Sequence, residues 1–227
     1  TSDATALPAA PVCRDLSPEQ RQDHAAHRCL RHTFLADGRR TALLARLAKA
    51  RKKASKDALN WYFEGRARLA ANPKRTLQHF KACHKVAHKP RWCFVGEALT
   101  LLRLERPREA LDRIQRARTK GARPPLLRAI EARARLGIGE SGRALGLARQ
   151  AAGSDPDDYD VLLALTECSV GREDLSRGMA RLELLIEREP HGAAAHLLLA
   201  ELAALRQSTG RAVKALQSGV AADGGDA

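Results

Sequence analysis

The sequence predicts an all-α, right-handed α-solenoid of repeated helical hairpins, and three observations favour this fold class. Small residues recur every 34 positions, at Thr76, Ala110, Ala144, Gly178 and Ala212. Two further columns keep the same interval, namely Phe80, Ile114, Ala148, Leu182 and Leu216, and Cys83, Ala117, Ala151, Leu185 and Gly219. Aromatic residues make up only 4% of the chain, which suits close-packed helices better than a sheet. A 34-residue period is typical of helix–turn–helix units that bury their apolar faces only by stacking.

The N-terminal part of the chain departs from this period. Residues 1–16 are rich in Ala and Pro and are expected to form a flexible leader. Residues 17–56 are expected to form a helical pair. Ser17 and Pro18 begin its first helix and Asp37-Gly38 ends it, and a second helix runs from Arg39 to about Ser55. This pair is a candidate degenerate repeat, although Arg46 occupies a position where the repeats have a core residue.

Residues 57–222 are expected to form about five hairpins, followed by a tail at 223–227. In the first hairpin Trp61 stands four residues before Gly65, the chain turns near Asn72-Pro73, and the second helix carries the small–aromatic–small set of the three columns. This hairpin resembles the tetratricopeptide repeat family. Later hairpins are expected to begin near Arg91, Pro125, Tyr159 and Ala193, with small or close-contact residues at Ala98, Ala132, Thr166 and Ala200 and closing prolines at Pro156 and Pro190.

The resemblance implies a concave groove lined by the first helix of each hairpin. By register, the lining residues are Tyr62, Arg66, Leu69, Val95, Leu99, Arg103, Ala129, Arg133, Leu163, Glu167, Leu197 and Glu201. The groove would run from arginines at one end to glutamates at the other. The family's chaperone-tail binders hold a terminal carboxylate with a Lys/Asn clamp, whereas Glu167 and Glu201 stand here where Asn is needed. A partner with an acidic portion near the arginines fits this groove better.

No catalytic or cofactor motif is found in the sequence, so we predict a protein that is not an enzyme and needs no cofactor. Residues 137–142 (GIGESG) resemble a phosphate loop, but they join two helices and lack a following Lys, so we interpret them as a hairpin turn. His84 and His88 lie four apart near His79 and Cys83, and His24, His27 and Cys29 form a second loose cluster. Neither group offers a fixed third ligand, and we predict no metal site.

Charge is unevenly distributed along the chain. Residues 1–120 hold 27 Lys and Arg against 11 Asp and Glu, and residues 121–227 hold 13 against 15. A basic half of this strength attracts polyanions or an acidic protein surface. The candidate polyanion patch is the polar face of the second helix and the turn after it, formed by Arg46, Lys49, Arg51, Lys52, Lys53 and Lys56. The alternative is an ordinary solvated face of a chain rich in arginine.

Five cysteines allow two interpretations. Disulfides Cys13–Cys29 and Cys83–Cys93 with Cys168 free suit a periplasmic, secreted or otherwise extracytoplasmic protein. Five reduced cysteines at small buried positions are the alternative. The Ala/Pro-rich leader favours export, and because the chain begins with Thr1 we consider that a signal peptide or anchor preceded it.

These patterns lead to a non-enzymatic adaptor or scaffold that binds a protein in the concave groove, within a cell-envelope assembly. One alternative is a module that binds an anionic envelope polymer, a lipid headgroup or nucleic acid through the basic half. Another is the interaction or sensor part of a larger membrane-anchored protein. The partner's identity and the oligomeric state are not encoded in these patterns.

Overall fold

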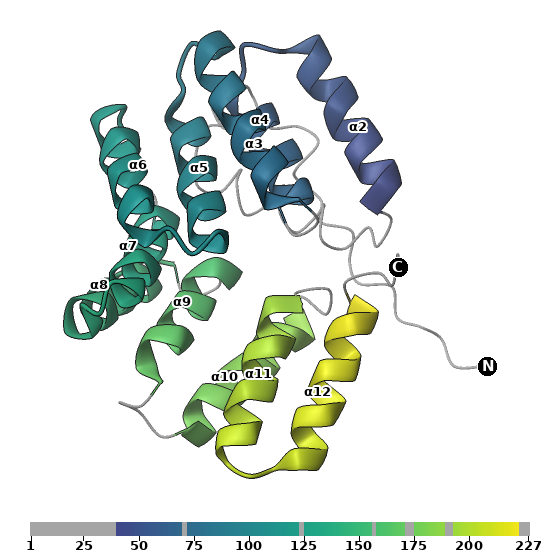
Figure 1. Ribbon diagram of the computed structural model, residues 1–227, viewed down its shortest axis with the longest axis vertical. Helices are drawn as coiled ribbons and strands as arrows, with labels where there is room; N and C mark the ends of the chain where they lie inside the picture. The colour runs from purple at the N-terminus through teal and green to yellow at the C-terminus, as the bar shows by residue number, and fades with distance from the viewer. Residues whose placement is uncertain are drawn as a thin grey trace.

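The computed structural model describes residues 40–69, 72–122, 125–155, 158–170, 175–188 and 193–222. These residues form helices stacked in chain order into a curved array (Figure 1). The helices are α2 (Arg40–Lys53), α3 (Ala58–Arg68), α4 (Pro73–Val86), α5 (Arg91–Arg103), α6 (Pro107–Thr119), α7 (Pro125–Gly137), α8 (Ser141–Ser154), α9 (Tyr159–Ser169), α10 (Leu175–Arg188), α11 (Ala193–Leu205) and α12 (Thr209–Ala222). The all-α solenoid predicted from the sequence is confirmed. The predicted leader, the first N-terminal helix and the tail lie outside the described residues.

Polar and proline residues mark the starts of several helices. Asp57 caps α3 by accepting a hydrogen bond from the Leu59 amide at 2.9 Å, and Asn72 caps α4 in the same way for Arg75, with Pro73 in the first turn. The later hairpins begin at Arg91, Pro125, Tyr159 and Ala193, as the period predicted. The second N-terminal helix was predicted to reach about Ser55. It ends at Lys53, because residues 54–56 form the turn before the Asp57 cap.

The turn inside the hairpins repeats its backbone geometry. After α5 the amide of Arg106 donates to the carbonyl of Leu101, and after α7 the amide of Glu140 donates to the carbonyl of Arg135. Each turn places one residue at positive φ, Glu105 at 57° and Gly139 at 87°. This arrangement closes a helix through a left-handed residue and satisfies its last carbonyls. Residues 137–142 therefore form the hairpin turn that the sequence predicted.

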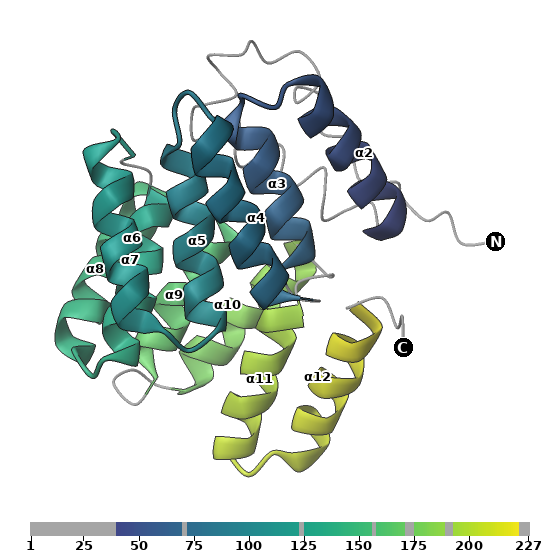
Figure 2. The ribbon, with the colours of Figure 1, turned by 45° about the horizontal axis from the view of Figure 1, so that its top comes forward.

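The three columns form the seam between helices, except at two positions on α12. Thr76, Ala110 and Ala144 are all at most 1% exposed, and so are Phe80 and Ile114. Small residues at these positions let the backbones approach closely. The exceptions are Gly219, which is half-buried, and Leu216. Leu216 belongs to the second column and was expected to fill a groove between hairpins, but its side chain is 47% exposed. That prediction was wrong because, among the described residues, no helix follows α12 to cover its outer face (Figure 2).

Candidate functional site

The first helix of each hairpin was predicted to line the binding groove, but five of the twelve named residues are buried. Their exposures are 0% for Tyr62, 0% for Val95, 4% for Leu99, 1% for Ala129 and 2% for Leu163. They belong to the core because α3, α5, α7 and α9 pack successively against one another. A partner cannot contact these five side chains in this conformation. Their assignment to the groove surface is therefore corrected.

Two of the groove's arginines are paired with carboxylates of the same chain. Arg133 donates from Nε to Oε2 of Glu167 at 2.6 Å and from Nη2 to Oε1 at 2.9 Å, so the pair is bidentate. The two residues are one repeat apart in sequence and join α7 to α9. The pair lies where the predicted arginine end of the groove meets the predicted glutamate end, and it neutralises both charges there. The repeat geometry brings a basic and an acidic member of neighbouring helices together.

The second pair closes the curve of the solenoid. Arg66 on α3 donates from Nη2 to Oδ2 of Asp160 on α9 at 2.9 Å, across 94 residues of sequence. Burial alone would lower the pKa of the Arg66 guanidinium, but the nearby charge of Asp160 raises it well above its usual value. Arg66 therefore stays charged and holds α3 near the start of α9. Sequence reasoning missed Asp160, because a contact over this distance depends on the summed rotation of several repeats.

The remaining groove residues are accessible to different degrees. Arg103 and Glu201 are exposed, Leu197 is 48% exposed, and Leu69 is half-buried. In the part of the chain that the structure describes, Arg103 is in no ion pair, in contrast to Arg66 and Arg133. The accessible part of the predicted groove therefore combines one unneutralised cation, apolar side chains and a carboxylate.

The predicted polyanion patch is divided by the structure. Lys49, Lys52, Lys53 and Lys56 are exposed, whereas Arg51 donates to Glu64 and lies over the Trp61 ring, 4.6 Å from its centroid. Arg51 therefore stabilises the contact between α2 and α3, since Glu64 is fully buried and needs a cationic partner. The Arg46 side chain lies outside the described part of the structure.

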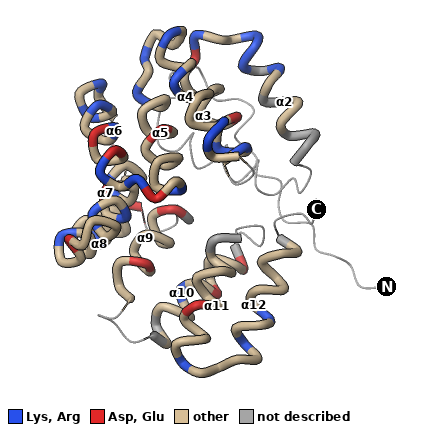
Figure 3. The backbone as a smooth tube through the Cα atoms, in the orientation of Figure 1, with Lys and Arg blue, Asp and Glu red and all other residues tan. Residues whose placement is uncertain are grey.

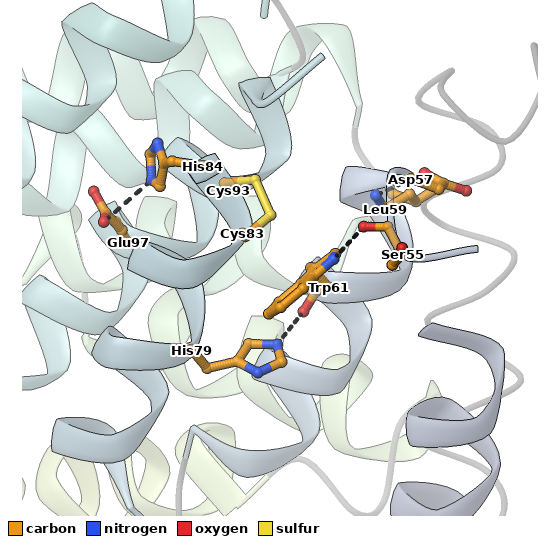
Figure 4. Close-up of a disulfide and its surroundings, with 9 residues drawn as sticks. All are labelled: Ser55, Asp57, Leu59, Trp61, His79, Cys83, His84, Cys93 and Glu97. Carbon is orange, nitrogen blue, oxygen red and sulfur yellow. Dashed lines mark hydrogen bonds and ion pairs between the residues drawn. A yellow bond between two sulfur atoms is a disulfide. The ribbon is translucent and has the colours of Figure 1, made fainter. Parts of the chain in front are cut away.

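Cys83 and Cys93 form a disulfide between α4 and α5, with their Cα atoms 5.8 Å apart (Figure 4). The predicted bridge is confirmed, and Cys83 is therefore not available as a metal ligand. Around it, Trp61 donates from Nε1 to the Ser55 carbonyl at 2.7 Å, and His79 donates from Nε2 to the Trp61 carbonyl at 3.0 Å. Cys13 and Cys29 lie outside the described residues.

Two histidines near the disulfide, His79 and His84, are engaged by neighbouring groups. Burial lowers the pKa of His79, and His84 lies with Nε2 3.1 Å from Oε1 of Glu97. Arg113 contacts the other oxygen of the same carboxylate at 2.9 Å. Within the described ranges, no group of three or more His, Cys, Asp or Glu side chains is arranged to hold a metal ion. None of the helices described is long and apolar enough to cross a bilayer.

Stacked helical hairpins with small residues at the seams define the class of helical-repeat solenoids. A family model described as tetratricopeptide repeat matches residues 139–202. The chain therefore resembles the tetratricopeptide repeat family over these residues, and the resemblance predicted from Trp61, Gly65 and the small–aromatic–small pattern is confirmed. Proteins of this family are generally non-enzymatic scaffolds for protein–protein interaction.

Solved structures share the fold at low sequence identity. A thermophilic tetratricopeptide-repeat protein of Thermus thermophilus, TTC0263, is 19% identical with a TM-score of 0.58, covering 74% of this chain and 92% of that chain. A chain of the APC/C hetero-tetramer Cut9–Hcn1 is 14% identical with a TM-score of 0.64, covering 90% of this chain and 41% of that chain. Human IFIT1, solved as a dimer with PPP-AAAA, is 16% identical with a TM-score of 0.59, covering 91% of this chain and 51% of that chain. No match was found among the curated proteins.

Proposed function

We propose that this protein is a non-enzymatic scaffold that binds a segment of a partner protein along the accessible part of its concave surface, within a cell-envelope assembly. The observation that carries the proposal is the set of first-helix residues left exposed or half-buried, Leu69, Arg103, Leu197 and Glu201. Leu197 is 48% exposed on an otherwise largely buried helix, which gives an apolar contact, and Arg103 supplies a cation for an acidic portion of the partner.

The internal ion pairs of the groove support this function by fixing its shape. Arg133–Glu167 joins the neighbouring first helices α7 and α9, and Arg66–Asp160 joins α3 to α9 across the curve; both arginines are half-buried. A pre-shaped groove loses less conformational freedom on binding than a flexible one. Arg66 and Arg133 therefore act as positioning residues, and Arg103 is the cation that meets the partner.

The test is recovery of a partner from extract of the native source by wild-type protein and by Arg103→Glu and Leu197→Asp. A discrete protein retained by wild type in high salt, and lost from both variants, supports the proposal. Arg116→Glu is the matched control, because Arg116 is exposed on α6, away from the first helices, and is in no ion pair among the described residues. A partner retained equally by all four proteins contradicts the groove as the binding surface.

A second candidate function is polyanion binding by the basic N-terminal part. Between residues 40 and 96 the chain has fifteen Lys and Arg residues and two acidic residues, Asp57 and Glu64. Asp57 is used as a helix cap, and Glu64 is fully buried in ion pairs with Arg51 and Arg68. Among the described residues of this range, the half-buried Asp57 is therefore the acidic side chain that remains partly accessible beside the exposed lysines.

A further inference from the structure

Two turns that are distant in sequence meet at one edge of the solenoid. The amide of His88, after α4, donates to the carbonyl of Lys56, after α2, at 3.2 Å. This contact joins the turn that carries Lys56, shortly after Lys52 and Lys53, to the turn that carries Lys89, shortly after Lys85. All five lysine side chains are exposed. We call these five residues the basic edge. Figure 3 shows Lys and Arg gathered around the ends of α2 and α4, with few acidic positions near them.

The lysines of the basic edge are not neutralised from within the chain. In the described part of the structure none of the five is in an ion pair, whereas Arg51, Arg68 and Arg113 are all paired with buried carboxylates. Two acidic groups of this region are buried and paired: Glu64 is 0% exposed, and Glu97 is 3% exposed between His84 and Arg113. The third, Asp57, is half-buried and caps α3. Arginines hold this region together internally, and lysines carry its outward charge.

The disulfide closes the segment that carries two of the five lysines of the basic edge. Cys83 and Cys93 are both fully buried and close a segment, HKVAHKPRW, that contains Lys85 and Lys89 (Figure 4). Because both ends of this segment are tied to the core, its lysines are held near Lys56 before any ligand binds. Val86 in the same segment is 41% exposed, so an apolar side chain stands among the lysines.

We propose that the basic edge docks on a membrane surface that contains anionic phospholipids. Clustered lysines are attracted to an anionic bilayer as point charges without fixed pairing geometry, each contributing about five-fold in affinity near the surface. An exposed valine among them suits the boundary between headgroups and acyl chains. The inference rests on the second candidate function, polyanion binding, and names its ligand; it is independent of the groove.

Two observations favour a membrane over nucleic acid. Single-stranded nucleic acid is bound by exposed aromatic side chains, but Trp61, Tyr62, Phe63, Trp92 and Phe94 are all at most 8% exposed. A structural disulfide also persists in oxidising compartments, where membrane surfaces are abundant and nucleic acid is not the usual ligand.

The test is co-sedimentation of the full chain with vesicles of phosphatidylcholine containing about one-third phosphatidylglycerol, against pure phosphatidylcholine, near physiological salt where screening acts over about 8 Å. We expect binding to the anionic vesicles only. The triple variant Lys56→Gln/Lys85→Gln/Lys89→Gln should bind about a hundred-fold more weakly. The matched control Lys74→Gln/Arg75→Gln/Lys214→Gln removes the same charge from exposed positions at the other end of α4 and on α12, and should bind within about five-fold of wild type.

Three outcomes overturn the proposal. Equal losses in the two triple variants would mean that net charge acts without a defined edge. The protein could instead fail to bind anionic vesicles but bind duplex DNA or polyphosphate, with that binding lost in the triple variant of the basic edge. This result would refute the membrane as the ligand and support polyanion binding as the function. Failure to bind vesicles, DNA and polyphosphate alike would refute both. Circular dichroism and melting of each variant establish that it is folded before binding is compared.

Discussion

Substitution of Gly65 by alanine tests the packing that joins the first two hairpins. A Cβ atom at Gly65 would lie 2.2 Å from Cζ of Phe80 and 2.7 Å from both Cε atoms. Carbon atoms pack at about 3.5–4.0 Å, so the ring would have to move by more than about 1 Å. The ring cannot retreat towards α5, because it already packs closely against α5 at Gly96, where a Cβ would lie only 2.3 Å from it. Phe80 is also 1% exposed, so no open space surrounds the ring.

The magnitude follows from two opposing terms. Overpacking a filled core costs about 1–3 kcal/mol, and replacing glycine by alanine inside a helix contributes about 0.5–1 kcal/mol of stability. Gly65→Ala should therefore destabilise the fold by roughly 1–2 kcal/mol. For a chain of this size, such a loss lowers the Tm by roughly 2–8 °C, measured by circular dichroism during heating.

Gly146→Ala is the matched control, since Gly146 lies inside α8 and an added Cβ there meets nothing within 4 Å. It should raise the Tm by roughly 1–4 °C, because only the helix propensity changes. Combining Gly65→Ala with Phe80→Leu should cost less than the sum of the single changes, since a smaller side chain relieves the overlap. A Gly65→Ala protein as stable as wild type would show that Phe80 does not set the approach of α3 to its neighbours.

Two further predictions concern cysteine and carboxylate chemistry. Burial raises the pKa of the Cys168 thiol to about 12, so the native protein should not react at Cys168 with a thiol reagent at a pH of about 8. Titration of the unfolded, unreduced chain should find one free thiol if Cys13 and Cys29 are bridged and three if they are not. Five free thiols would contradict the Cys83–Cys93 disulfide. Burial alone would raise the pKa of Glu131, but hydrogen bonds from Arg118 and Arg135 outweigh it and lower that pKa. Its ion pairs therefore add stability above the unfolded pKa of about 4.3, and this stability is lost as pH falls through the lowered pKa. Urea unfolding should accordingly show Glu131→Gln less stable than wild type at a pH of about 7, with the difference shrinking towards a pH of about 3; a difference independent of pH would contradict the ion-pair explanation.

Local features of the fold were predictable because the same residue types recur in the sequence at a fixed interval. The starts at Arg91, Pro125, Tyr159 and Ala193 follow from the 34-residue period together with caps and prolines. The Cys83–Cys93 bridge was predictable because the end of one helix lies beside the start of the next. The repeat period does not predict the exposure of Leu216, because a position that is buried in an internal repeat is exposed in the last described helix.

The candidate sites were less predictable because they depend on which arginines and carboxylates lie within hydrogen-bond distance of each other. Register places Arg66 and Arg133 on the first helices correctly, but it does not reveal that Asp160 and Glu167 lie within hydrogen-bond distance of them. The partners are 94 and 34 residues away, and the longer contact depends on the accumulated curvature of several hairpins. A groove drawn from register alone therefore overstates the charge available to a ligand.

Arginine and lysine have different roles in this structure because their charged groups differ in shape and hydration. A planar guanidinium can satisfy a carboxylate through two parallel hydrogen bonds, as Arg133 does for the half-buried Glu167. Arg113 and Arg135 pair with the buried carboxylates of Glu97 and Glu131. A lysine ammonium is strongly hydrated and loses more when it is buried, so it remains at the surface. The net charge of the chain is therefore a poor measure of the positive charge that its surface offers to a ligand. The lysines that meet at the Lys56–His88 contact are the better guide to where an anionic surface would be bound.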